Sequence, residues 1–176
     1  MNVDLYVRAL RFASAAHDAQ RLPDGDHPYL VHLASVAAEV IAALRAEPGR
    51  DEDLAVACAL LHDVVEDTEV PAAAIAQAFG DRVAAGVVAL SKRDDIPKAE
   101  RLDDSLRRIR EQPPEVWMVK LADRIVNLTP PAPTKWTREK RLAYREEGER
   151  IHAALSGASA HLAARLRARV EGYPTG

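Results

Sequence analysis

Apolar side chains recur at helical spacing along most of the chain. Near the amino terminus, Val3, Val7 and Leu10 lie three or four positions apart, so they share one face of an amphipathic helix. β-Branched residues further along keep the same spacing, as in Val83 and Val87. No stretch alternates apolar and polar residues over the length of a strand. The pattern therefore predicts an all-α chain.

Prolines and glycines divide this pattern into about eight or nine helices. Proline is tolerated in the first turn of a helix and glycine often follows the last, so Pro71 and Gly80 mark the start and end of a short helix. The segment Leu22–His27 is predicted as a loop, and Thr129–Thr134 as a rigid Pro-rich connection. The predicted helices cover about residues 3–20, 28–45, 52–67, 71–80, 81–91, 98–111, 115–128, 138–155 and 159–171.

Length and composition indicate a single globular domain. The 176 residues suit one helical bundle, predicted over residues 1–171 and followed by a flexible tail at 172–176. A net charge of −3 and an aromatic content of 5% argue against a nucleic-acid partner. The single cysteine, Cys58, excludes an intrachain disulfide and lies in an apolar run, which predicts a small buried side chain.

The amino-terminal residues do not form a signal peptide, and no apolar stretch reaches the roughly 18 residues that a membrane span needs. We therefore expect a cytoplasmic protein without a membrane partner. The sequence leaves the oligomeric state open, a homo-oligomer included.

Carboxylates and an imidazole directly follow an apolar run in the segment His62–Asp67. On a continuous helix, His62 shares a face with Glu66, and Asp63 shares a face with Asp67, because each pair is four residues apart. Carboxylates this close repel one another unless a cation lies between them. The segment therefore predicts a divalent-cation site or, alternatively, a solvated acidic helix end with a hydrogen-bonded histidine.

Two more polar residues interrupt predicted helix faces. His32 lies one turn into the second predicted helix, and Asp123 interrupts an apolar face. Burying an unpaired carboxylate costs several kcal/mol, so Asp123 needs a cation or Arg124 as its partner. Together with His62 and Asp63, these residues offer two nitrogen and two oxygen ligands. That set suits a hydrolytic Mn²⁺, Fe²⁺ or Zn²⁺ site with positions open for water.

The order His … His-Asp … Asp is similar to the signature of the HD metal-dependent phosphohydrolase superfamily. The fuller pattern resembles the RelA/SpoT-type (p)ppGpp hydrolases, including their small single-domain members, over about residues 3–155. This resemblance implies a helical bundle of the HD type and metal-dependent removal of pyrophosphate from (p)ppGpp. The segments that carry it are His17–Arg21, Pro28–His32, Ala59–Thr68, Phe79–Gly80 and Lys120–Leu128.

The resemblance also implies a role for individual residues. The implied ligands of one Mn²⁺ are His32, His62, Asp63 and Asp123. The residues implied to position or deprotonate the attacking water are Glu66 and Asp67. The implied substrate contacts are Arg21 at the purine, Asn127 and Tyr144 near the nucleoside, and Lys98 at the phosphates. A surface position for Arg21 and Lys98 and core packing for Tyr144 are the alternatives.

The chain departs from the family pattern near the expected nucleotide site. Leu22 and Pro23 follow Arg21, where the family often has a basic residue, and Thr129-Pro-Pro stands where the family tends to have an arginine. Two alternatives to the (p)ppGpp hydrolase therefore stay open. One is a phosphohydrolase of ppApp-like, 3′-phosphorylated or 5′-mononucleotide substrates, and the other is a non-catalytic nucleotide sensor. The adjacent Glu66 and Asp67 argue against the sensor, since a binder needs no water-activating residues.

Overall fold

The computed structural model describes residues 1–23 and 25–175, and its regular elements are all helical. The α-helices are α1 (Val3–Ala16), α2 (Leu30–Ala46), α3 (Glu52–Leu61), α4 (Val64–Asp67), α5 (Ala72–Phe79), α6 (Asp81–Leu90), α7 (Arg101–Arg110), α8 (Pro114–Asn127), α9 (Arg138–Leu155) and α10 (Ala160–Glu171). Short 3₁₀ turns, η1 (Lys98–Glu100) and η2 (Ser156–Ala158), precede α7 and α10. With α3 and α4 counted as one interrupted helix, the described residues form nine α-helices, which confirms the predicted all-α class.

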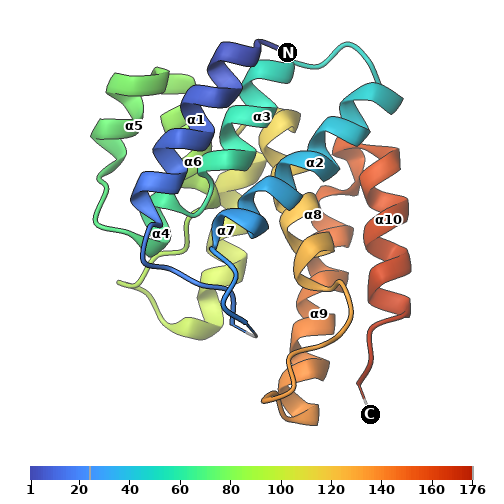
Figure 1. Ribbon diagram of the computed structural model, residues 1–176. Coiled ribbons are helices and arrows are strands. Elements are labelled where there is room, and N and C mark those ends of the chain that lie inside the picture. Colours follow the sequence, from blue (N-terminus) through green and yellow to red (C-terminus); the bar gives the residue numbers. More distant parts are fainter. Residues whose placement is uncertain (24, 176) are drawn as a thin grey trace.

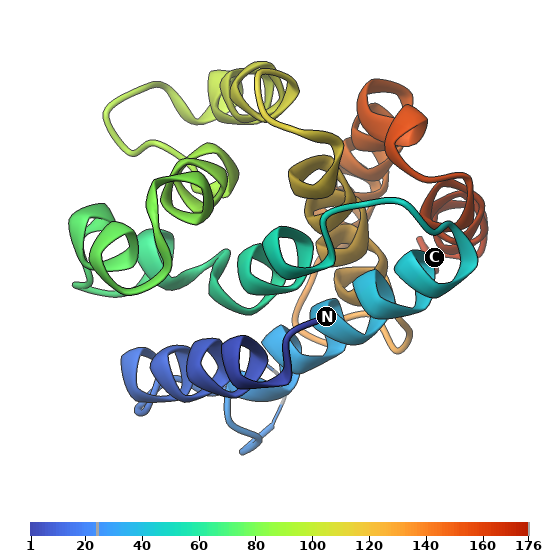
Figure 2. The same cartoon turned by 90° about the horizontal axis from the view of Figure 1, so that it is seen from above.

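Helices α3 and α8 form the centre of the bundle (Figure 1). Every residue of α3 from Leu54 to Leu61 is buried, and so are most residues of α8. A helix that is apolar all round must be covered on all sides. Accordingly, α1, α2 and α6 pack around α3, while α2, α9 and α10 pack around α8. Figure 2 shows α1 and α2 along one side of the bundle and α5, α6 and α7 along the other.

Close packing in this core requires glycine at one position of α6. A Cβ atom on Gly86 would lie 2.7 Å from the Cys58 sulfur of α3 and 3.0 Å from Val116 of α8. Cys58 is itself fully buried, so the prediction of a small buried side chain is confirmed. The absence of a side chain at Gly86 lets α6 approach both central helices.

The first loop differs in extent from the prediction. Helix α1 ends at Ala16 rather than near Gln20, and α2 begins at Leu30, after Pro28. Backbone bonds across the loop explain both shifts: the N–H of Gln20 donates to the His17 carbonyl, and the N–H of Tyr29 donates to the Gln20 carbonyl. These bonds fix the loop backbone in a turn, so neither helix extends into it.

The carboxyl terminus is partly anchored. Tyr173 lies in the segment predicted to be a flexible tail, yet its side chain is buried against the core. Gly176 lies outside the described residues. The division of the chain at residue 171 stays a prediction. Within residues 1–23 and 25–175, no helix combines the length and the apolar character that crossing a bilayer requires.

Candidate metal centre and adjoining pocket

Three elements bring two imidazoles and two carboxylates together. His32 comes from the first turn of α2, His62 and Asp63 from the turn after α3, and Asp123 from α8. The Nε2 atoms of the histidines are 3.4 Å apart. Asp123 Oδ1 lies 3.4 Å from His32 Nε2 and 3.8 Å from His62 Nε2, and Asp63 Oδ2 lies 3.5 Å and 3.0 Å from the same two atoms. The four residues singled out in the sequence therefore converge.

The donor atoms fit a divalent transition metal. The ligand atoms of His32, His62 and Asp123 all lie within 4.8 Å of one another, and all three residues are buried. Asp63 is close enough to both histidines to add a second oxygen. Imidazole nitrogens combined with carboxylate oxygens suit Mn²⁺, Fe²⁺ or Zn²⁺ better than Mg²⁺ or Ca²⁺, which prefer oxygen ligands alone. The cluster can therefore hold a divalent metal ion.

The turn that separates α3 from α4 orients His62. The sequence predicts one continuous helix over residues 52–67, whereas α3 ends at Leu61. The Nδ1–H of His62 donates to the carbonyl oxygen of Ala59 at 2.9 Å. In an uninterrupted helix that carbonyl would accept from the backbone N–H of Asp63, so the His62 side chain competes with the backbone for it. With its proton on Nδ1, the ring presents the lone pair of Nε2 to the cluster, as a metal ligand must.

Hydrogen-bond donors hold both carboxylates in place. Asp123 accepts from Lys120 Nζ at 3.1 Å and from Asn127 Nδ2 at 2.5 Å, and Asp63 accepts from the Tyr29 hydroxyl at 2.6 Å. Burial and the adjacent Asp63 raise the pKa of Tyr29, so its hydroxyl keeps the donating proton. These outer contacts fix the orientation of the oxygen atoms that face the histidines.

The electrostatics of the cluster favour a positive charge at its centre. Burial opposes protonation of His62, but Asp63 and Asp123 outweigh it and raise the pKa of His62 to about 10. Burial also opposes ionisation of the two carboxyls. Nevertheless, His62 beside Asp63 and Lys120 beside Asp123 hold the pKa of each carboxyl well below its usual range. Two ionised carboxylates therefore face a space that a proton or a metal ion must neutralise.

The partner of Asp123 corrects one expectation. Arg124, the proposed alternative to a cation, does not pair with Asp123; its guanidinium donates to Glu147 at 2.9 Å and lies 4.0 Å above the Tyr144 ring. Lys120 pairs with Asp123 instead, because residues three apart share a helix face whereas neighbours point about 100° apart.

Glu66 and Asp67 of α4 contact different parts of the protein. Glu66 accepts from the backbone N–H of Lys92 at 2.7 Å and from its Nζ at 2.8 Å. Asp67 accepts from Gln20 Nε2 at 3.1 Å. Burial and the nearby Asp63 carboxylate raise the pKa of Asp67. The two carboxylates thus flank the cluster from neighbouring positions on a short helix, one held by the α6–α7 loop and the other by the first loop.

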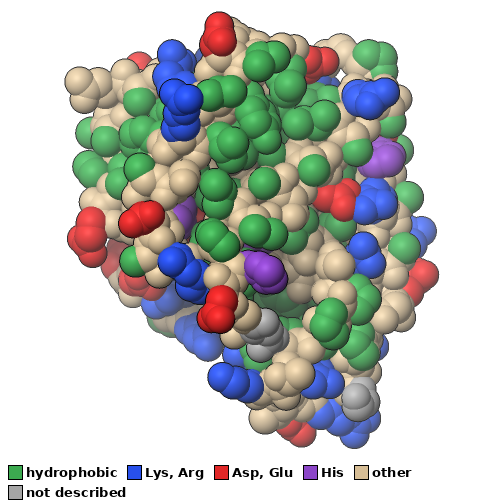
Figure 3. Space-filling view, viewed as in Figure 1, with side chains coloured by type: hydrophobic (Ala, Val, Ile, Leu, Met, Phe, Trp, Pro, Cys, Tyr) green, Lys and Arg blue, Asp and Glu red, His purple; other side chains and the backbone are tan. Residues whose placement is uncertain are grey.

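A pocket of about 400 Å³ adjoins the cluster, and His32 lines both. Asn127 and Tyr144, the two residues predicted to lie near the nucleoside, also line it. The edge of the Tyr144 ring meets Trp136, with ring centroids 4.8 Å apart. The remaining wall is mostly apolar and comes from Leu22, Pro23, Val31, Val126, Pro131 and Pro133, with His27, Ser35 and Thr129 as its polar members. On the face seen in Figure 3, the surface is hollowed just below the centre, beside a histidine side chain.

Two of the expected substrate contacts lie outside this pocket wall. The Arg21 guanidinium donates to the backbone carbonyls of Asp18 and Gln20, and the side chain is exposed. Lys98 begins the 3₁₀ turn η1 and is also exposed. The structure instead places Lys92 against Glu66.

Four polar residues of the site are missing from the sequence-based set: Gln20, Tyr29, Lys92 and Lys120. Lys120 carries a signal that could have been used, because it interrupts the same apolar helix face as Asp123. Lys92 lies 26 residues from Glu66, and Gln20 lies 47 residues from Asp67. Local spacing gives no information about such distant contacts.

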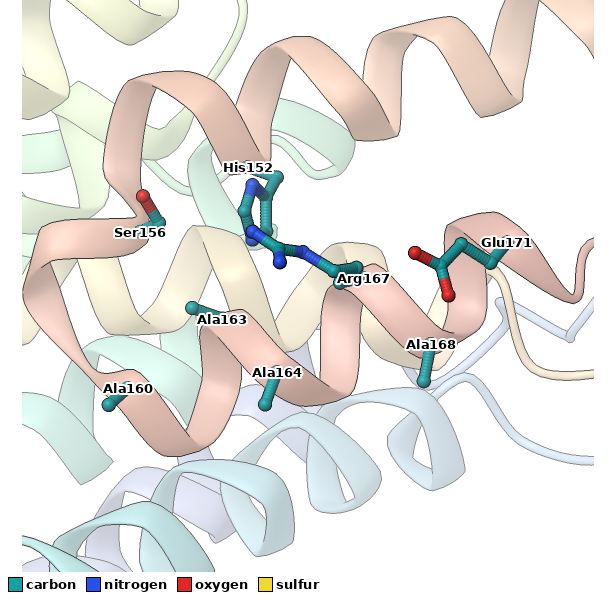
Figure 4. A pocket seen from close by; sticks show the side chains of 8 residues that line it. All are labelled: His152, Ser156, Ala160, Ala163, Ala164, Arg167, Ala168 and Glu171. Atoms are coloured by element: carbon teal, nitrogen blue, oxygen red, sulfur yellow. The ribbon is translucent and has the colours of Figure 1, made fainter.

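A second hollow, of about 500 Å³, lies between α9 and α10. Figure 4 shows that alanines form much of its floor, with His152 and Arg167 beside each other above it. None of its lining residues belongs to the cluster of histidines and carboxylates. The chemistry of the cluster, rather than the size of the hollow, identifies the candidate active site.

Comparison with known proteins finds relatives over most of the chain. The HD-domain family matches residues 9–161. The guanosine-3′,5′-bis(diphosphate) 3′-pyrophosphohydrolase of Aquifex aeolicus (strain VF5) is 33% identical over 154 residues, which are 85% of this chain and 20% of the relative. Two MESH1 proteins, which carry the same enzyme name, align over 92% of this chain and 90% of their own length. Identity is 28% for the Drosophila melanogaster protein and 30% for that of Mus musculus.

Two solved structures share the fold. The first, described as a metazoan ortholog of SpoT that hydrolyzes ppGpp, is 28% identical, with a TM-score of 0.80 over 95% of this chain and 94% of its own. The second, lmo0812 from Listeria monocytogenes EGD-e, is 25% identical, with a TM-score of 0.63 over 82% of this chain and 94% of its own. The match therefore extends across the whole helical bundle.

Proposed function

Because this chain belongs to the HD-domain family, we propose that it is a metal-dependent phosphohydrolase that releases pyrophosphate from the 3′ position of (p)ppGpp. The observation that carries the proposal is the convergence of His32, His62, Asp63 and Asp123 beside a pocket of nucleoside size. The MESH1 relatives, which match this chain over most of their length, support the choice of substrate.

The four clustered side chains are proposed to hold one Mn²⁺, with Fe²⁺ and Zn²⁺ as alternatives. A bound divalent ion supplies positive charge that polarises the phosphoryl group and lowers the pKa of water. Lys120, Asn127 and Tyr29 keep the carboxylate oxygens of Asp123 and Asp63 in position. The protein itself therefore contributes a preorganised set of ligands that needs little rearrangement on binding.

Glu66 and Asp67 are proposed to receive the proton of the attacking water. The water oxygen bonds to the phosphorus attached at the 3′ oxygen, and the bond between that phosphorus and the 3′ oxygen breaks. The electron pair of the broken bond stays on the 3′ oxygen, which takes up a proton from solvent to become the 3′ hydroxyl, and pyrophosphate is released. An ionised carboxylate one hydrogen bond away can accept the water proton. Burial opposes protonation of Lys92, but Glu66 outweighs this and raises the pKa of Lys92 to about 12. Lys92 therefore stays charged and can offset phosphate charge.

The apolar pocket is proposed to receive the nucleoside. Asn127 and Tyr144 line it next to His32, so a nucleoside there would have its phosphates at the cluster. Contacts of Arg21 with the purine and of Lys98 with the phosphates stay predictions, because both side chains are exposed and lie outside the pocket wall. Figure 3 shows Lys and Arg side chains gathered below the hollow, which suits a polyphosphate ligand in a protein of net charge −3. A cytoplasmic location and a homo-oligomeric assembly stay predictions.

Purified protein supplied with Mn²⁺ should release pyrophosphate from ppGpp, and a chelator should abolish the release. The Asp63→Ala variant should show no turnover, because it lacks one oxygen ligand. Pyrophosphate can be measured by a coupled phosphate assay and the nucleotide product by chromatography. A matched control is Asp103→Ala on the exposed face of α7, which should keep wild-type turnover.

Three outcomes would contradict the proposal. Turnover retained in Asp63→Ala would exclude catalysis by the clustered ligands. Equal or faster cleavage of a 5′-mononucleotide, or of ppApp, would favour the other phosphohydrolase activities. Nucleotide binding without turnover under every divalent metal would favour a sensor.

A further inference from the structure

The first loop places a glutamine against one of the two water-activating carboxylates. Gln20 Nε2 lies 3.1 Å from Asp67 Oδ2, across 47 residues of chain. Within residues 1–23 and 25–175, Gln20 is the one side chain that hydrogen-bonds the carboxylate of Asp67, which is otherwise exposed. An exposed carboxylate without such a contact would rotate freely, whereas proton transfer needs a fixed geometry.

The orientation of the Gln20 amide follows from its two neighbours. An ionised carboxylate only accepts hydrogen bonds, so the atom of Gln20 that faces Asp67 is the NH₂ group. Its carbonyl oxygen, Oε1, then faces His17 Nδ1 at 2.6 Å. A carbonyl oxygen only accepts, which places the His17 proton on Nδ1. The contacts therefore run in one direction, from His17 to Gln20 to Asp67.

The His17 ring is built into the protein rather than free in solvent. It is buried, and it lies against the Tyr29 ring with centroids 5.0 Å apart. Its Nε2 atom has no hydrogen-bond partner among the described residues, so Nδ1 carries the polar contact of the ring. The backbone of Gln20 is fixed from both sides, by its bond to the His17 carbonyl at 2.9 Å and by the bond it accepts from Tyr29 at 3.0 Å.

We propose that Gln20, held by His17, is a positioning residue that fixes the Asp67 carboxylate for proton acceptance. This inference rests on the proposed function, in which Asp67 receives the proton of the attacking water. The same loop reaches Asp63 through the Tyr29 hydroxyl. One segment thus orients a metal-ligand carboxylate and a water-activating carboxylate together.

The test compares two replacements of Gln20 that differ in shape and chemistry. Gln20→Leu removes both polar atoms, and Gln20→Glu keeps the size of the side chain but replaces the donor with a second carboxylate. Both should lower kcat about tenfold, as expected for loss of one hydrogen bond to a charged group, and leave KM and Mn²⁺ affinity unchanged. A role in packing alone would tolerate Gln20→Glu. The control is Gln77→Leu, which alters an exposed glutamine of α5 and should keep wild-type kcat.

A double-mutant cycle identifies the route of the effect. If Gln20 acts through Asp67, then Gln20→Leu should cause no further loss in an Asp67→Asn background. Likewise, His17→Phe, which keeps a ring beside Tyr29, should lower kcat severalfold on its own and cause no further loss when combined with Gln20→Leu. Thermal unfolding of each variant shows that the protein remains folded.

The possible failures are distinguishable. Absence of pyrophosphate release by the wild-type protein overturns the proposed function. If the wild-type protein releases pyrophosphate, two results overturn the inference about Gln20 alone. One is a wild-type kcat in Gln20→Glu, and the other is additive losses of kcat in the double-mutant cycle. Wild-type kcat in Asp67→Asn also overturns it, because no carboxylate would then need positioning.

Discussion

The orientation of individual side chains in this site is set by hydrogen bonds to groups outside the cluster. His62 offers Nε2 to the cluster because its Nδ1 proton is bound to the Ala59 carbonyl. Glu66 is held by both the backbone N–H and the ammonium group of Lys92. A bound water near α4 would therefore meet a carboxylate whose position is set from outside the cluster.

Replacing Glu66 by alanine should separate catalysis from metal binding. We expect kcat to fall by about 10²-fold or more, as for loss of a general base, while Mn²⁺ and nucleotide binding persist. Single-turnover kinetics and metal titration measure the two properties independently. Glu69→Ala, at an exposed position two residues after α4, is the control and should be unaffected. Loss of metal from Glu66→Ala would show that Glu66 is a ligand instead.

Helices carry their own constraints, independent of the chemistry. Asp51 caps α3: its Oδ1 accepts from the N–H of Leu54 at 3.1 Å, and its Oδ2 accepts from Arg82 at 2.9 Å. The hydrogen bond from the Leu54 N–H lowers the pKa of Asp51. Burial acts in the opposite direction, and the nearby Arg82 lowers the pKa further. On α6, the absence of a side chain at Gly86 lets that helix pack closely against α3 and α8.

The cap should give a stability difference that depends on pH. At neutral pH, Asp51→Ala should lower the free energy of unfolding by about 1 kcal/mol. A depressed folded-state pKa means that the contribution of the ionised group is complete above 3.8, the ordinary value, and is lost as pH falls through the lower folded value. Urea unfolding between pH 7 and pH 3 measures this. Asp51→Asn, which still accepts the Leu54 bond but does not ionise, should lose less stability than the wild type as pH falls, because the other carboxyls still titrate in both proteins. Identical pH profiles for the variant and the wild type would refute the assignment.

Packing should dominate helix propensity at Gly86. Alanine favours a helix over glycine by about 1 kcal/mol, yet its Cβ would lie 2.7 Å from Cys58 Sγ, and overpacking a core costs about 1–3 kcal/mol. We expect Gly86→Ala to destabilise the fold, as measured by urea unfolding. The cost should shrink in a Cys58→Ala background, which removes the sulfur. Gly157→Ala, where the added Cβ meets open space, is the control.

The cluster connects elements that are far apart in the chain, so metal binding should stabilise the whole molecule. Its ligands come from α2, from the turn after α3 and from α8, which pack against one another at the centre of the bundle. A ligand that binds only the folded state shifts the unfolding equilibrium by mass action.

Mn²⁺ at about one hundred times its Kd should raise the free energy of unfolding by about 2.7 kcal/mol, a rise in Tm of roughly 5–10 °C. His32→Ala should lose this shift, because the variant lacks one nitrogen ligand. His152→Ala, in the hollow between α9 and α10, should keep it. Differential scanning calorimetry with and without metal measures both. An equal Mn²⁺-induced shift in His32→Ala would contradict the placement of the ion.

Local spacing was enough to predict the helical elements. Helices α9 and α10 lie within one residue of their predicted bounds, because caps, prolines and apolar periodicity act over a few residues. The chemistry of His32, His62, Asp63 and Asp123 was also visible, since polar groups on apolar faces need partners wherever the chain takes them. The prediction of a continuous helix over 52–67 was wrong, because the His62 side chain competes with the backbone for the Ala59 carbonyl.

Partners from distant segments could be found only in the folded molecule. Asp123 pairs with Lys120 rather than Arg124, Glu66 meets Lys92, and Asp67 meets Gln20. The last two contacts cross loops whose path depends on how α1, α2, α6 and α7 pack. Helix formation is a short-range property of backbone and spacing, whereas the orientation of a catalytic carboxylate is a property of the three-dimensional packing around it.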